Sequence, residues 1–170
     1  MENNLPLIFI IFFQILKALA TKKKRPVALV KAITFHLTLR KDINDLKMVS
    51  DALYSAASLS IKDPDFIESL LIHGLTVLKQ NHESKIEISA VLRSIVNSLG
   101  QLKFYHAEFM DEISSWYCQK IKDGTKLHHK DLLAFLMTTA TINYCPKDSD
   151  TIYEVHNCLK KFRDLFYCIS

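Results

Sequence analysis

The chain has 170 residues, of which 49% are hydrophobic, and it contains only three glycines. Because most α/β enzymes need glycine at tight turns and in phosphate loops, this scarcity favours an all-helical protein and argues against a nucleotide-dependent enzyme. The formal net charge of +4 is uneven: residues 1–47 carry nine Lys/Arg against three Asp/Glu, and the remainder carries thirteen against fifteen. A basic end of this kind suits phosphate groups or an anionic membrane surface, although most such runs are only solvated.

The first residues form a strongly apolar run, LPLIFIIFF at positions 5–13. Its charge polarity is wrong for a secretory signal, because no Lys or Arg precedes it and the basic run Lys22–Arg25 follows it. Polar residues also interrupt the run before it reaches the roughly 20 residues of a membrane-spanning helix. Aligning Pro26 with Pro64 makes the run the first helix of an incomplete repeat, buried against a further unit that this chain lacks. A signal, an anchor and a mis-assigned start remain open alternatives.

Apolar residues recur at three- and four-residue steps along most of the chain and predict seven or eight helices. Asp63-Pro64 supplies a cap followed by a first-turn proline, Pro26 is expected at a first helical position, and Gly124 supplies a left-handed turn. The predicted helices are Leu7–Ala20, Val27–Leu39, Leu46–Leu59, Asp65–Gln80, Ile86–Gln101, Ala107–Ile121, Leu127–Ile142 and Ser149–Phe162.

The segments between paired helices resemble one another at intervals of about 38–43 residues. Leu59–Phe66 has a counterpart at Leu102–Phe109 and a looser one at Ile142–Ile152. An internal period of this length is typical of a solenoid, in which neighbouring units complete one another's core. The sequence therefore predicts an all-α solenoid of about four antiparallel helical hairpins, near residues 7–39, 46–80, 86–121 and 127–162. The whole of 1–170 is expected to be one array without a domain boundary.

Catalytic and metal-binding motifs are missing from the sequence. There is no GxxxxGK[ST], GxGxxG, HExxH or GxSxG, so we expect no enzyme, no cofactor and no small-molecule substrate. His128-His129, Cys118 and Cys145 do not repeat the ligand spacing of tetrahedral zinc, and the histidines are expected to be cap or surface residues. The four cysteines form no CxxC pair and are expected to be free thiols in a reducing compartment.

Aromatic and basic residues gather near the inter-helix turns. Helical-repeat proteins read single-stranded RNA by stacking bases on such rings and by hydrogen bonds from successive repeats. The alternative is that the aromatic rings close each hairpin by packing, and a protein-interaction scaffold of the same fold remains open. The candidate RNA-binding residues are Lys22, Lys23, Lys24, Arg25, Lys62, Arg93, Asn97, Lys103, Tyr105, Asn143 and Tyr144.

Three segments resemble the repeat phrases of the FAST-kinase-domain-containing family. The phrase Ile142-Asn-Tyr-Cys-Pro146 is similar to its "leucine-asparagine-tyrosine-x-proline" helix ends, and Ser94–Tyr105 and Ala56–Pro64 resemble its leucine-rich helix ends. The branch with the most similar phrases is that of transforming-growth-factor-β regulator 4. The resemblance covers roughly residues 15–165.

This resemblance implies an octotricopeptide-like α-solenoid that binds mitochondrial transcripts in the matrix and supports their stability or processing. Other RNA-processing proteins are implied as partners, and protein kinase activity is not. The family's C-terminal RAP module would follow further along, but nothing after Phe162 has room for it. The expectation is therefore a fragment truncated at both ends. No mitochondrial presequence is visible, and membrane association is not expected.

Overall fold

The computed structural model describes residues 5–40, 43, 45–80 and 87–146, together with the single positions 152, 153, 155, 157 and 160. Across these residues the protein is all-α, as predicted, and contains no strand. The helix bounds lie within two residues of the predicted ones. The helices are α1 (Leu5–Thr21), α2 (Val27–Thr38), α3 (Leu46–Ser58), α4 (Pro64–Gln80), α5 (Glu87–Leu102), α6 (Ala107–Lys122) and α7 (His129–Thr141). The predicted eighth helix lies outside the described residues except for those five single positions, which are helical.

Short polar side chains begin several of the helices. The carboxylate of Asp45 accepts a hydrogen bond from the Lys47 backbone N–H at 2.8 Å and so caps α3. The Nδ1 atoms of His106 and His128 accept backbone N–H groups in the same way and cap α6 and α7. These side chains satisfy donors that the first helical turn leaves without partners. The prediction that His128 is a cap residue is confirmed.

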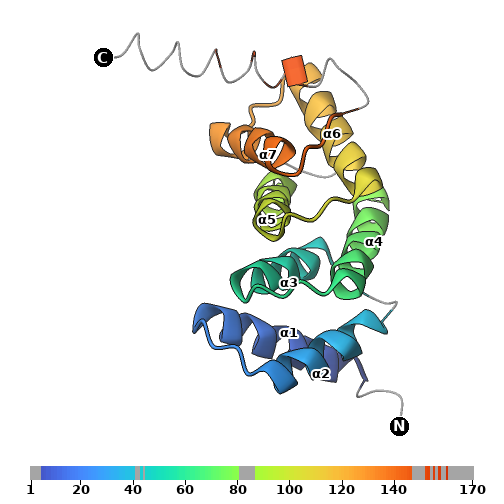
Figure 1. Ribbon diagram of the computed structural model, residues 1–170. Coiled ribbons are helices and arrows are strands. Elements are labelled where there is room, and N and C mark those ends of the chain that lie inside the picture. The colour runs from blue at the N-terminus through green and yellow to red at the C-terminus, as the bar shows by residue number, and fades with distance from the viewer. Residues whose placement is uncertain are drawn as a thin grey trace.

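The helices form two rows, which can be followed in Figure 1. Helix α3 packs between α1 and α5, and α5 packs against α7, so the odd-numbered helices lie side by side. Helices α2, α4 and α6 form the second row, with α4 in contact with both of its neighbours. The core lies between the rows and is continuous from Phe13 in α1 to Val155. Each pair of helices therefore shares its buried surface with the next pair.

Close approach in the second row depends on one glycine. A Cβ atom at Gly74 in α4 would lie 3.1 Å from the Phe109 ring and 3.2 Å from the Val49 side chain. The Phe109 ring of α6 is fully buried against this glycine. At this distance a side chain at position 74 would require the Phe109 ring and the Val49 side chain to shift by a few tenths of an ångström in a close-packed interior. Gly74 thus lets α6 approach α4.

Helix α1 is apolar on more than its core face. Phe13, Leu16 and Ala20 are buried, whereas Ile10 and Ile11 are about half exposed. Helix α1 thus packs against the rest of the protein and still exposes apolar side chains. In the described part of the chain, no helix is both long enough and apolar enough to cross a membrane.

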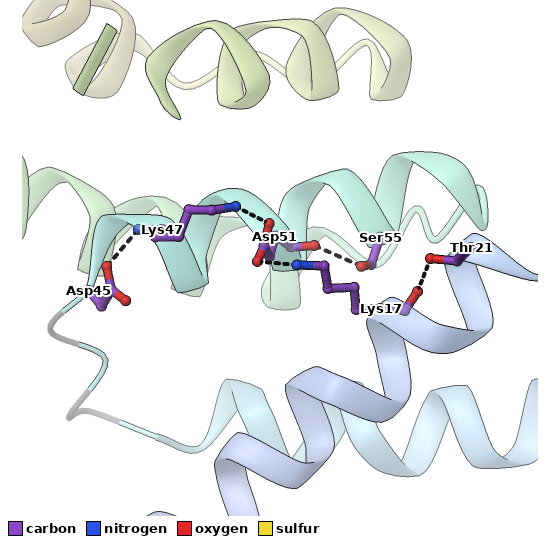
Figure 2. A network of polar contacts seen from close by, with 6 residues as sticks. All are labelled: Lys17, Thr21, Asp45, Lys47, Asp51 and Ser55. Carbon is purple, nitrogen blue, oxygen red and sulfur yellow. Dashed lines mark hydrogen bonds and ion pairs between the residues drawn. The ribbon is translucent and has the colours of Figure 1, made fainter. Parts of the chain in front are cut away.

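A polar network ties α1 to α3 across their exposed side (Figure 2). The ammonium groups of Lys17 and Lys47 reach the two carboxylate oxygens of Asp51 at 2.8 and 2.5 Å. Partial burial raises the pKa of Asp51, but the hydrogen bonds from Lys17 and Lys47 outweigh it and hold the pKa below its usual range. Two cations thus share the Asp51 carboxylate, and the carboxylate of Asp45 lies in the same network.

Candidate nucleic-acid interface

Every odd-numbered helix ends in the same turn. One residue of each turn has a positive φ between 49° and 54°, the left-handed conformation that commonly ends a helix. The N–H of the following residue then donates to the carbonyl five residues earlier, which is the Schellman motif. The left-handed residues are Lys23, Ser60, Lys103 and Asn143, and the donors that follow them are Lys24, Ile61, Phe104 and Tyr144, at 2.8–3.1 Å.

These turns define the register of the repeat. The left-handed residues are separated by 37, 43 and 40 residues. The N-cap position of each following even-numbered helix lies three residues after the left-handed residue of the turn. The residues at these N-cap positions are Pro26, Asp63 and His106. The alignment of Pro26 with Pro64 is therefore wrong by one residue, since Pro26 corresponds to Asp63. Pro26 is also the N-cap of α2 and not its first residue, because the turn fixes the distance to the cap.

The four turns follow one another along the row of odd-numbered helices. Arg25 of the first turn and Lys62 of the second line one pocket, and the ring centroids of Tyr105 and Tyr144, from the third and fourth turns, lie 6.2 Å apart. We call the four turns together the turn edge: residues 22–26, 59–63, 103–106 and 142–146. It carries six Lys/Arg against one Asp. The predicted residues that are exposed on it are Lys22, Lys23, Lys24, Arg25, Lys62, Lys103, Tyr105 and Asn143.

The RNA contact predicted for Tyr144 is wrong, because this side chain is buried. Its side chain is 6% exposed, and its hydroxyl donates to Oδ1 of Asp111 at 2.8 Å. Burial and this carboxylate both raise the pKa of the Tyr144 hydroxyl well above its usual range. The residue after the left-handed position turns inward here, as it does at Ile61, so the ring packs against α6 and cannot stack on a base. Packing of the ring, the alternative to RNA contact, is confirmed for Tyr144, but the contact is with α6 of the preceding pair of helices.

Tyr105 and Tyr144 occupy different positions in their turns, although the sequence comparison treated them as equivalent. The turns align Phe104 with Tyr144 and place Tyr105 one position later, where the side chain is 53% exposed. Its ring centroid lies 6.2 Å from that of Tyr144. Tyr105 is therefore an exposed ring supported from one side.

Arg93 forms an ion pair within the protein. Its guanidinium donates to Oδ1 of Asp131 at 2.6 Å, and the Ser89 hydroxyl donates to the other carboxylate oxygen. Asp131 is buried at the start of α7. Arg93 therefore holds α5 on α7, and its charge is neutralised where a phosphate contact was expected. The partner lies 38 residues away, so no local pattern could have indicated the pair.

Asn97 lies on an exposed row that the sequence reasoning only partly found. It stands six residues before the left-handed residue of its turn, and one residue in each other odd-numbered helix stands at the same place. All four are exposed. They are Lys17, Tyr54, Asn97 and Met137. Counting back from each turn would have found the other three.

A second set of polar residues lies one helical turn further along, on the same side of each helix. These side chains stand four residues after the first set, so each pair of positions projects from one face. All four are exposed and can form hydrogen bonds. They are Thr21, Ser58, Gln101 and Thr141. We call the eight residues together the exposed row.

The described residues contain no cluster of side chains that could bind a metal ion. No group of three or more His, Cys, Asp or Glu side chains lies close enough to hold an ion there. His128 and His129 stack at a centroid distance of 4.4 Å while His128 serves as a cap. Cys118 is buried and Cys145 exposed, both as free thiols.

Comparisons of the sequence with protein-family models, with curated proteins and with solved structures gave no match. The resemblance to the FAST-kinase-domain-containing family therefore stays a prediction.

Proposed function

We propose that the chain is a segment of an α-solenoid that binds single-stranded RNA along the exposed row and the turn edge. The observation that carries the proposal is the exposed row. Each odd-numbered helix presents two side chains four residues apart at the same place, next to a cationic edge. Repeat proteins that read RNA use two or three side chains of each repeat for one base.

The side chains of the row suit different parts of a strand. The Tyr54 ring offers a stacking surface for a base. The amides of Asn97 and Gln101 can donate and accept hydrogen bonds to base edges, and no hydrogen bond within the described structure engages either side chain. Lys17 shares Asp51 with Lys47, so positive charge remains for a phosphate. The cations of the turn edge add further phosphate contacts.

The cellular role is proposed from the resemblance alone. The family phrases support transcripts in the mitochondrial matrix as the RNA, transcript stability or processing as the outcome, and other RNA-processing proteins as partners. The RNA is bound and not chemically changed by this part of the chain.

A binding assay over a range of salt concentrations tests the proposal. We expect the chain to bind unstructured single-stranded RNA at low salt and to lose affinity steeply as salt rises. If the six cations of the turn edge each contact one phosphate, the slope of log affinity against log salt should approach roughly −4. A chain that is folded by circular dichroism but binds no RNA at low salt would disprove the proposal.

A matched pair of variants locates the binding surface. Tyr54→Ala should weaken RNA binding by about 1–3 kcal/mol, the usual contribution of one stacked base. Phe35→Ala removes a ring from α2, in the other row, that is 62% exposed against 48% for Tyr54, and should leave affinity unchanged. Equal losses in both variants would contradict the assignment of the exposed row.

A protein-interaction scaffold is the second candidate function. Leu133 and Met137 stand one turn apart on α7 and are 51% and 63% exposed, so they form an apolar spot that includes one member of the exposed row, Met137. Such side chains favour a protein partner over a phosphate backbone. Affinity purification from RNase-treated extract separates the two functions. A partner that survives RNase treatment and is lost in Met137→Ser supports the scaffold.

A further inference from the structure

A half-open pocket of about 390 Å³ lies between the first two turns of the turn edge. The α1–α2 turn contributes Arg25, and the α3–α4 turn contributes Ser60, Ile61 and Lys62. Helix α2 forms the remaining wall. Pockets of about 300–1,000 Å³ hold small ligands, so this volume suits a single nucleotide. We call it the turn pocket.

Three cations surround the turn pocket, namely Arg25, Lys31 and Lys62. None of them forms an ion pair within the described part of the chain. Asp63 is the one carboxylate in the lining, and its Oδ1 already accepts the Phe66 backbone N–H at 3.3 Å. The pocket therefore carries excess positive charge that an anion of more than one charge would neutralise.

The walls between these cations are apolar. Val27, Val30 and Ile61 line the pocket, and Ile61 is held inward by the Schellman hydrogen bond of its turn. Thr34, which is buried, adds a hydroxyl that donates to the Lys31 carbonyl at 3.2 Å and can still accept a hydrogen bond. An apolar surface beside clustered cations matches the two halves of a nucleotide, its sugar and base on one side and its phosphate on the other.

The same position in the later turns does not repeat this charge. Arg25 and Lys62 stand two residues after the left-handed residue of their turns, where the third and fourth turns have Tyr105 and Cys145. Between the third and fourth turns, the rings of Tyr105 and Tyr144 lie against each other instead. The cationic pocket is therefore special to the first pair of turns.

We propose that the turn pocket binds a terminal phosphate monoester, either at the end of an RNA strand or on a free mononucleotide. A monoester carries up to two negative charges, whereas an internal phosphodiester carries one, and three cations lining one pocket favour the more highly charged group. The strand-end form of the proposal rests on the RNA binding proposed above, and the mononucleotide form does not.

Isothermal titration calorimetry on the full chain tests this proposal. The probes are one short RNA sequence with a 5′-phosphate, with a 3′-phosphate or with hydroxyls at both ends, together with AMP and adenosine. We expect one phosphorylated RNA to bind roughly tenfold more tightly than the hydroxyl-ended RNA, the factor of about one charge-assisted hydrogen bond. We expect AMP to bind and adenosine not to bind.

Variants assign the effect to the pocket. Lys31→Ala and Lys62→Ala, each checked for an unchanged melting temperature, should abolish the phosphate-dependent difference. Lys79→Ala removes an exposed cation at the far end of α4 and should preserve it. A preference that survives both pocket variants would overturn the proposal.

The outcomes separate the two proposals and the two ligand sources. Binding of AMP without any effect of RNA phosphorylation identifies a free mononucleotide as the ligand. Binding of phosphorylated RNA and AMP, with none of hydroxyl-ended RNA, supports the turn pocket and contradicts binding along the exposed row. Absence of AMP binding, combined with equal affinities for all three RNAs, would overturn the pocket proposal while leaving RNA binding intact.

Discussion

Replacing Gly100 with alanine should destabilise the protein, although alanine is the better helix former. Gly100 lies near the end of α5, where α7 comes closest to it. An added Cβ would lie 2.9 Å from Oγ1 of Thr138 and 3.6 Å from its Cβ and Cγ2. That hydroxyl donates to the Val96 carbonyl at 3.0 Å, so it cannot move away without losing a buried hydrogen bond.

The magnitude follows from two opposing effects. Overpacking of this kind costs about 1–3 kcal/mol, whereas replacing glycine with alanine inside a helix gains about 0.5–1 kcal/mol. We expect Gly100→Ala to lower the free energy of unfolding by about 1 kcal/mol. In a Thr138→Ala background the clashing oxygen is absent, so the same substitution should raise the free energy of unfolding by about 0.5–1 kcal/mol.

Urea unfolding followed by far-ultraviolet circular dichroism measures all four proteins of this cycle. Ala90→Gly, at an exposed position of the same helix, calibrates the intrinsic difference between the two residues. The reasoning predicts a change of sign between the two backgrounds. If Gly100→Ala stabilises the protein that retains Thr138, the close approach of α5 and α7 is wrong.

Three further predictions concern single side chains. Asp51→Asn should lower the free energy of unfolding by about 1 kcal/mol or less near pH 7. The pKa of Asp51 in the folded protein is below 3.8, so this difference from the wild type should persist above pH 4 and shrink as the pH falls through that pKa. Urea unfolding at a series of pH values measures the difference. Lys103→Gly should raise the free energy of unfolding by about 0.5–1 kcal/mol, and with it the melting temperature, because glycine tolerates the left-handed conformation of this turn. Gln101→Gly, inside the helix, should lower the melting temperature. Tyr144→Phe should lose about 1–2 kcal/mol of stability through its hydrogen bond to Asp111, and unchanged RNA affinity in the refolded variant would support its inward role.

The positions of the helices could be predicted because their signals are local. An apolar stripe with a 3.6-residue period and a polar cap at its start depend only on neighbouring residues. Asp45 and His128 cap helices where the sequence suggested a beginning. The turns were also found, but their alignment was wrong by one residue at Pro26, because proline was given more weight than backbone geometry.

The candidate site was only partly predictable. The basic residues of the turns are exposed as expected, since charged side chains at turns have little to bury them. The intramolecular partners of Arg93 and Tyr144 could not be predicted, because Asp131 and Asp111 lie in other helices. Lys17 and Tyr54 were missed because their rows appear only when the turns are brought into register.

The sequence by itself determined the class of fold, the helices and the uneven charge, because periodicity, caps and composition act over a few residues. The tertiary structure alone decided which of these residues share a surface. Contacts between residues about 40 positions apart depend on how neighbouring helices stack, and a shift of one residue turns a different side chain toward the core. That stacking places Tyr144 inside, neutralises Arg93, and brings Arg25 and Lys62 to opposite sides of one pocket.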